Sequence, residues 1–106
     1  MKRRVADIDD LDDGLDGLAE ALVALGDAAK VRAFLEDLCT PAEIEAMTDR
    51  WRVVPLLVEG VPYREIHERT AVSVTTIGRV ARTLDRGAGG YAAAIERLAA
   101  AAPRRR

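Results

Sequence analysis

PYREIHERTAVSVTTIGRVARTLD, residues 62–85, is the stretch that decides the fold of this chain. Its pattern predicts two short helices, over residues 62–69 and about 74–85, which are joined by Thr70-Ala71-Val72-Ser73. Four apolar side chains are spaced to form a small core between two such helices at a steep angle: Ile66, Val72, Ile77 and Val80. A short turn between two helices that share such a wedge indicates a helix-turn-helix.

The second of these helices has two chemically different faces. At about 100° per residue, one face carries apolar side chains: Ile77, Val80, Ala81 and Leu84. The opposite face carries hydroxyl and guanidinium groups: Thr75, Arg79, Arg82 and Arg86. A recognition helix needs this division, because its inner face packs on the protein while its outer face donates to base edges and phosphates in the major groove. Ser73 is placed to cap this helix, which leaves the first N–H groups near a phosphate.

An ordinary helical hairpin with a solvated arginine face is the simpler interpretation of the same residues. Such a surface usually mixes charges of both signs, whereas this outer face holds three arginines and no acid until Asp85. The charge is also divided along the chain: residues 1–49 carry 5 Lys and Arg against 13 Asp and Glu, a net −8, and residues 50–106 carry 11 Arg against 5 acids, a net +6. A cationic docking face is compatible with the overall charge of −2. We therefore favour double-stranded DNA as the partner.

The rest of the chain also has the pattern of helices. Leucines at steps of three and four residues predict a helix from Leu15 to Gly26, and Asp27 is placed to cap a second helix that ends near Cys39. Thr40-Pro41-Ala42-Glu43 combines a capping hydroxyl, a proline at the first helical position and a carboxylate at the third, so a third helix begins here. A last helix is defined by Tyr91, Ile95 and Leu98 and stops at Pro103.

The third helix carries an apolar seam that is wide enough to pack on another helix of the same or of a second subunit. Its members recur at steps of three and four residues: Ile44, Met47, Trp51, Val54 and Val58. Pro55 lacks a backbone donor and crowds the preceding turn, so we expect a kink or a break near residues 51–55. Trp51 fits an anchor in a dimer core better than a platform for a ligand.

The composition favours an all-α chain with a single domain. Four aromatic residues among 106 leave the core to Leu, Val, Ile and Ala, which suits helices better than sheets. Six Asp lie among residues 7–16, so we expect an acidic flexible arm over residues 1–14, one helical domain over 15–102 and a basic tail over 103–106. Neither a signal peptide nor a long apolar run is present, and we expect a cytoplasmic protein without a membrane partner.

No group of residues suggests an enzyme, a metal site or a disulfide. Cys39 is the single cysteine, and no cluster of His gives it a metal-binding partner. We interpret it as a small buried filler rather than a redox thiol, because Glu36 and Asp37 lie beside it. A nucleophile–base pair is also absent from the sequence. We expect no catalytic residue, no metal ion and no enzymatic activity.

A family resemblance covers roughly residues 31–98. The segments FLEDLCTPAEIEAM, DRWRVVPLLVEGVPYREIHERTAVSVTTIGRVARTL and DRGAGGY resemble the Trp repressor superfamily, most closely its YerC/YecD branch. The resemblance implies a six-helix subunit that intertwines with a second copy into a homodimer, each subunit offering one helix-turn-helix to half of an operator. It implies a DNA-binding transcriptional regulator of the bacterial nucleoid, expected to be a repressor, that inserts the helix after Ser73 into the major groove.

The same resemblance assigns residues to the DNA interface. Contacts of the Trp repressor fall on Tyr63, Arg64 and His67 of the first motif helix, and on Val74, Thr75, Thr76 and Gly78 of the second. To these we add Ser73, Arg79 and Arg82 from the helix pattern. His67, which is the single histidine, replaces a lysine of the family; a phosphate contact and a satisfied histidine between the helices are both open.

The resemblance also implies a pocket for a small effector. The family's tryptophan-binding threonine, two sandwiching arginines and a serine correspond to Thr40, Arg50, Arg79 and Thr83. However, Val80 replaces a glycine that lets the indole of L-tryptophan lie against the backbone. Its isopropyl group should fill that space, so we favour neither tryptophan nor another cofactor. Arg50 and Arg79 would then serve phosphates or ion pairs between subunits.

Two turns of the chain have a composition that can be interpreted. Ala71 stands where many such turns have glycine, so a left-handed backbone there would carry a strain of about 1 kcal/mol. The run from Gly87 to Gly90 is interpreted as a turn between helices, because no Lys-Ser/Thr follows to make a phosphate loop.

The alternative function is a protein–protein interaction module of the transcription machinery, which would use the same fold without specific DNA readout.

Overall fold

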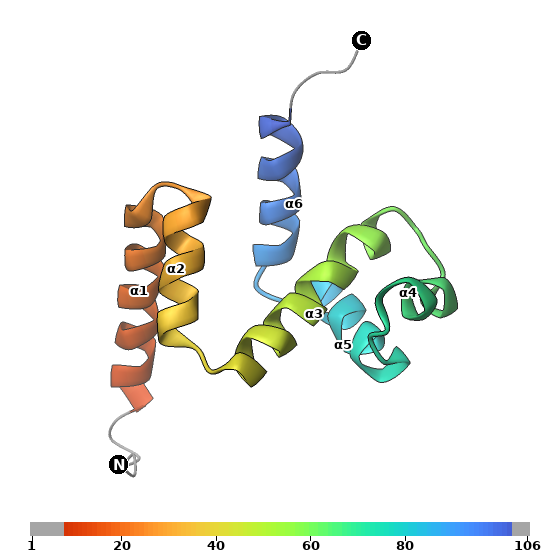
Figure 1. The fold of residues 1–106 in the computed structure, drawn as a ribbon, viewed down its shortest axis with the longest axis horizontal. Helices are drawn as coiled ribbons and strands as arrows, with labels where there is room; N and C mark the ends of the chain where they lie inside the picture. Colours follow the sequence, from red (N-terminus) through yellow and green to blue (C-terminus); the bar gives the residue numbers. More distant parts are fainter. Residues whose placement is uncertain (1–7, 103–106) are drawn as a thin grey trace. The chain divides into compact units, whose positions relative to one another are not determined.

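The computed structural model describes residues 8–102, and in that range it contains helices and no strands (Figure 1). The six helices are α1 (Ile8–Leu25), α2 (Ala28–Leu38), α3 (Pro41–Val58), α4 (Tyr63–Thr70), α5 (Val74–Arg86) and α6 (Gly90–Ala101). The prediction of an all-α chain with six helices is therefore confirmed. The predicted basic tail, residues 103–106, lies outside the described residues.

The chain divides into two compact units, Met1–Pro41 and Ala42–Arg106, where the composition had favoured a single domain. In the first unit, α1 and α2 lie side by side as a helical hairpin (Figure 1). Asp27 caps α2 as predicted, because its Oδ1 accepts the backbone N–H of Lys30 at 2.9 Å. From residue 10 to residue 41 no side chain is buried. The hairpin therefore forms without enclosing a core of its own.

The start of α1 corrects the predicted flexible arm. Residues 8–14 are helical, so the arm predicted over residues 1–14 is wrong for this part, and residues 1–7 lie outside the described range. Leu11 extends the leucine spacing one step before Leu15, and the surrounding aspartates obscured that continuation. Aspartates are also favourable in the first turns of a helix, where the helix dipole attracts negative charge.

The second unit encloses the hydrophobic core. Its buried side chains come from α3, α4, the turn and α5: Val53, Val54, Ile66, Val72, Ile77 and Val80. All four predicted wedge residues are among them, and each is at most 5% exposed. Removing an aliphatic side chain of this size from water stabilises the fold by about 1.5–3 kcal/mol. The core thus fixes α4 and α5 against each other and against α3.

Helix α3 begins at Pro41, as predicted, and continues unbroken through Pro55. The break allowed by the proline does not occur; Val53 and Val54 directly before it are fully buried, and this packing offsets one lost backbone hydrogen bond. The predicted seam is covered unevenly. Val54 is buried, whereas Met47 is 37% and Val58 52% exposed.

Helix α6 completes the second unit. It follows Gly89, whose φ is 89°, and its Tyr91 and Ile95 pack against the core. The ring of Tyr91 lies 6.4 Å from that of Trp51, centroid to centroid, at an interplanar angle of 44°. Trp51 is thus half-buried within the second unit. No helix within residues 8–102 is long and apolar enough to cross a membrane.

Candidate nucleic-acid interface

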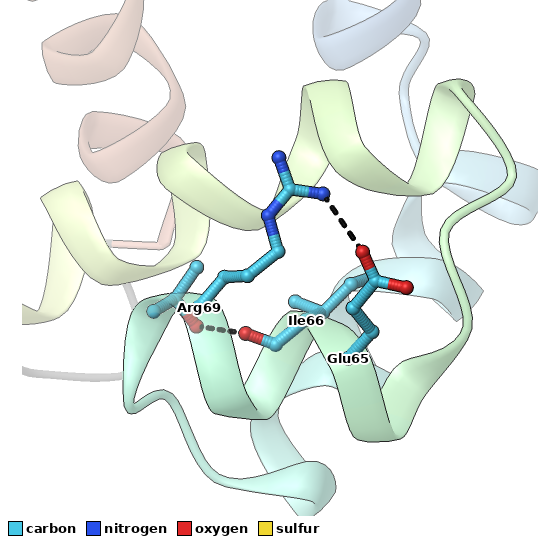
Figure 2. Close-up of polar contacts among 4 residues, drawn as sticks. Glu65, Ile66 and Arg69 are labelled. Atoms are coloured by element: carbon cyan, nitrogen blue, oxygen red, sulfur yellow. Dashed lines mark hydrogen bonds and ion pairs between the residues drawn. The ribbon is translucent and has the colours of Figure 1, made fainter.

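Helix α4 orients one apolar side chain inward and keeps its charges outside. Ile66 is fully buried, while Glu65 and Arg69 form an exposed ion pair with 3.2 Å between Oε2 and Nη1 (Figure 2). The spacing and the order, with Glu one turn before Arg, favour the helix by about 0.3–0.5 kcal/mol. Arg69 is therefore engaged with its own helix.

The turn after α4 is held by its backbone and by two side chains of the helix. Ala71 has a φ of 64°, in the left-handed region, and its N–H donates to the carbonyl of His67 at 2.8 Å. Ala71 thus adopts the left-handed conformation for which a strain of about 1 kcal/mol is expected. The N–H of Val72 donates to the hydroxyl of Thr70 at 3.1 Å, and the carbonyl of Val72 accepts from Nδ1 of His67 at 2.7 Å. His67 thus has a hydrogen-bond partner for Nδ1 inside its own helix-turn-helix, and its contact with a phosphate stays a prediction.

Ser73 is the N-cap of α5, as the sequence predicts. Its Oγ accepts the backbone N–H of Thr76 at 3.1 Å and donates to the Thr76 hydroxyl at 3.0 Å. This double contact fixes the first turn of the helix. It also orients the half-buried Thr76, while Val74 and Thr75 beside it stay exposed.

The outer face of α5 has the predicted division between apolar and cationic groups. Ile77 and Val80 are at most 1% exposed. The side chains on the opposite face are all exposed: Thr75, Arg79, Arg82 and Arg86. Arg86 lies 3.5 Å from the carboxylate of Asp85. Among residues 8–102, Arg64, Arg79 and Arg82 have no ion-pair partner, so their charges are available to an anion.

An open hollow lies between the start of α4 and one side of α5. Its volume is about 570 Å³, and its lining consists of Tyr63, Gly78, Ala81, Arg82, Asp85 and Arg86. Tyr63 is 43% exposed at its edge. Gly78 has no side chain that would fill part of the hollow. A Cβ built on it would have no neighbour within 4 Å, so the space beside it is open. The hollow offers a phenol, two guanidinium groups and the carboxylate of Asp85, which pairs with Arg86.

The structure brings the predicted DNA-binding residues onto one helix-turn-helix. Those that are exposed are Tyr63, Arg64, His67, Ser73, Val74, Thr75, Arg79 and Arg82; Thr76 and Gly78 are half-buried. The sequence interpretation missed Asp85 and Arg86 as lining of the hollow. Their spacing of three and four residues from Arg82 was the available signal. It also missed Thr70, whose role depends on the path of the turn.

The residues predicted for an effector pocket belong to both units. Thr40 lies in the first unit, and Arg50, Arg79 and Thr83 lie in the second; each is exposed. Val80 is 1% exposed and belongs to the core cluster. Cys39, expected to be buried, is half-buried. Within residues 8–102 no group of three or more His, Cys, Asp or Glu is arranged to hold a metal ion.

Packing at the end of α5 explains one glycine of the run before α6. A Cβ on Gly87 would lie 2.5 Å from the carbonyl oxygen of Thr83, too close for any side chain without a backbone shift. The N–H of Gly87 donates to that oxygen at 2.7 Å. The run is a turn between helices, as predicted, and a second hollow of about 310 Å³ lies beside it.

Comparison with known proteins gives three consistent matches. Residues 13–99 match the family described as Trp repressor protein. The uncharacterized protein YerC of Bacillus subtilis strain 168 is 37% identical over 84 residues, which is 79% of this chain and 81% of that protein. The crystal structure of a TrpR-like protein from Eubacterium eligens ATCC 27750 is similar with a TM-score of 0.76 at 37% identity, covering 82% of this chain and 90% of the other.

Proposed function

Since the chain belongs to the Trp repressor family, in its YerC-like branch, we propose that it is a sequence-specific DNA-binding regulator of transcription. The cationic outer face of α5 is the observation that carries this proposal. Its arginines point away from a fully buried aliphatic face, so they can approach a groove without disturbing the core. The N-terminal turn of α5 would enter the major groove, where Val74 and Thr75 are exposed for bases.

Each part of the interface has a proposed task. Arg64 and Arg82, without ion-pair partners in the described chain, would donate to base edges or phosphates. Tyr63 and Arg86 line the open hollow beside Gly78, where they would contact part of a sugar–phosphate strand. Arg79 would contact a phosphate beside the recognition helix. Ser73 fixes the first turn, so that free N–H groups of α5 face the DNA.

We further propose that the active form is a homodimer. The hairpin has no buried side chain from residue 10 to residue 41, yet Leu11, Leu15 and Val23 are 47%, 62% and 81% exposed. Large apolar side chains exposed to this degree along one helix are typical of a surface that a partner covers. With two copies, two helix-turn-helix motifs would read an inverted repeat, and occupancy of such an operator would repress the adjacent promoter.

Selection of bound fragments from a genomic DNA pool tests the proposal. We expect an inverted repeat to be enriched, and its binding in a mobility-shift assay to weaken steeply as salt rises from about 50 to about 200 mM. A recovered repeat without two-fold symmetry would contradict the dimer. Binding without sequence preference or salt dependence would instead favour the interaction module of the transcription machinery.

We propose no dependence on L-tryptophan. Val80, at the position where the family's pocket has glycine, occupies the core with its isopropyl group. Regulation would then require no small cofactor, and the protein would act at the nucleoid in the cytoplasm. The family consists of regulators, and we assign this chain no enzymatic activity.

A further inference from the structure

The turn of the helix-turn-helix is satisfied by side chains of α4. Val72 is 5% exposed, so its backbone N–H and carbonyl need partners inside the protein. The hydroxyl of Thr70 accepts the N–H at 3.1 Å and itself donates to the carbonyl of Ile66 at 2.7 Å. Nδ1 of His67 reaches the Val72 carbonyl at 2.7 Å. Both polar groups of one peptide residue thus depend on the last turn of α4.

Val72 directly precedes Ser73, the N-cap of α5. The direction of the Val72 carbonyl sets the plane of the peptide that leads into Ser73, because a trans peptide is rigid. Its side chain is fixed in the core and its carbonyl is fixed by His67. This one hydrogen bond, together with the buried side chains between α4 and α5, therefore sets the direction in which α5 begins.

We propose that His67 is a positioning residue for DNA reading, which acts by holding the Val72 carbonyl rather than by contacting a phosphate. The inference rests on the proposed DNA binding. A carbonyl oxygen only accepts, so Nδ1 must carry the hydrogen. In the neutral ring Nε2 then has no hydrogen and cannot donate to a phosphate oxygen. A phosphate contact through Nε2 would therefore require the protonated ring, whereas the bond to the Val72 carbonyl is made by the neutral ring as well.

Three substitutions separate the two roles. Asparagine carries an N–H₂ donor near the place of Nδ1, so His67→Asn can keep the bond to Val72. Glutamine places its amide one carbon further out, and alanine has no donor, so His67→Gln and His67→Ala lose the bond. Glu68→Gln, a neighbouring exposed position on α4, is the matched control. Each full-length variant is titrated with the selected duplex over a range of salt concentrations.

We expect His67→Asn and Glu68→Gln to bind within about twofold of the wild type. His67→Gln and His67→Ala should bind about five- to tenfold more weakly, in keeping with the loss of one hydrogen bond. The salt dependence should keep its slope in all four variants, because no phosphate contact is lost. If His67→Ala does not fold, the comparison of His67→Asn with His67→Gln decides whether the bond to Val72 is needed for DNA binding.

Nitrogen-15 NMR of the wild-type imidazole supplies a readout without DNA. We expect the Nδ1–H form in the neutral ring. An Nε2–H form would overturn the proposal. The proposal would also be overturned if His67→Asn bound DNA as weakly as His67→Ala and the slope of its salt dependence fell by about one phosphate contact. If His67→Ala binds DNA as well as the wild type, the positioning role of His67 is overturned and the proposed function is not. If the wild type binds no duplex, the proposed function is overturned, and the positioning role of His67 in DNA binding is overturned as well.

Discussion

The α1–α2 hairpin and the α3–α6 unit use the same kind of sequence pattern with opposite results. Both have aliphatic side chains at helical spacing, but Leu15 of the hairpin is 62% exposed, whereas Ile77 of α5 is fully buried. Periodicity therefore identifies the apolar face of a helix and does not say what covers it. The unit that carries the proposed DNA interface encloses a core within its own chain, whereas the apolar face of the hairpin is left exposed, and we propose that a second copy covers it.

Removal of the buried side chain of Ile77 should have the largest effect, a loss in the free energy of unfolding. Ile77→Ala leaves a cavity between α4 and α5 and should lower the free energy of unfolding by roughly 2–5 kcal/mol. Ile77→Val removes one methylene and should cost only about 0.5–1.5 kcal/mol. Urea unfolding followed by circular dichroism measures both. Equal effects of the two changes would mean that the wedge is not the stabilising core.

A charge on the hairpin should act on association instead. Leu15→Glu puts a carboxylate on the exposed apolar face and should weaken the homodimer by roughly 2–3 kcal/mol, or about 30- to 150-fold. Ala24→Glu, nine residues later and on the opposite side of α1, introduces the same charge and is the control. Sedimentation velocity over a dilution series measures the dissociation constant. If neither change alters it, the hairpin is not the dimer surface.

The arginines of the second unit should affect DNA binding without affecting the fold. Arg82→Ala and Arg64→Ala should each weaken operator binding by roughly 1–3 kcal/mol while the subunits stay folded and paired. Arg97→Ala on α6, which is also exposed but lies off the helix-turn-helix, controls for the loss of charge. Unchanged binding in both interface variants would place the interface elsewhere.

A smaller effect, of opposite sign, is expected in the turn. Ala71 adopts a φ of 64°, which glycine tolerates without strain. Ala71→Gly should therefore raise the stability by about 0.5–1 kcal/mol. Ala93→Gly in the interior of α6 should lower it by a similar amount. Thermal unfolding of the two variants shows whether each change raises or lowers the stability. A loss of stability in both variants would contradict the left-handed turn.

The smallest expected effect is that of L-tryptophan. Because Val80 fills the core at 1% exposure, we expect no saturable rise in Tm when the amino acid is added. A clear, saturable stabilisation would show that the subunit rearranges around Val80 and that an effector pocket exists.

Helix ends that carry their own chemical signal could be predicted from the sequence. Asp27, Pro41 and Ser73 cap or open their helices at the expected places, because a capping oxygen or a proline acts on neighbours a few residues away. The four wedge residues could also be predicted, because a helix-turn-helix leaves few apolar positions between its helices.

Features that depend on tertiary packing could not be predicted. The burial of Val53 and the unbroken course of α3 through Pro55 follow from contacts with residues far along the chain. The bond from His67 to Val72 requires the left-handed Ala71, which brings the carbonyl back toward α4. In the hairpin, α1 begins at Ile8 rather than at the predicted Leu15, because the aspartates before Leu15 have the pattern of a solvated segment.

The packing of Trp51 on Tyr91 gives the molecule a built-in optical reporter. Trp51 is the single tryptophan, and it lies in the unit that bears the helix-turn-helix. Its fluorescence therefore follows the melting of that unit, while far-ultraviolet ellipticity follows all six helices. If the hairpin frays first on dilution, ellipticity will fall while the indole emission remains unchanged.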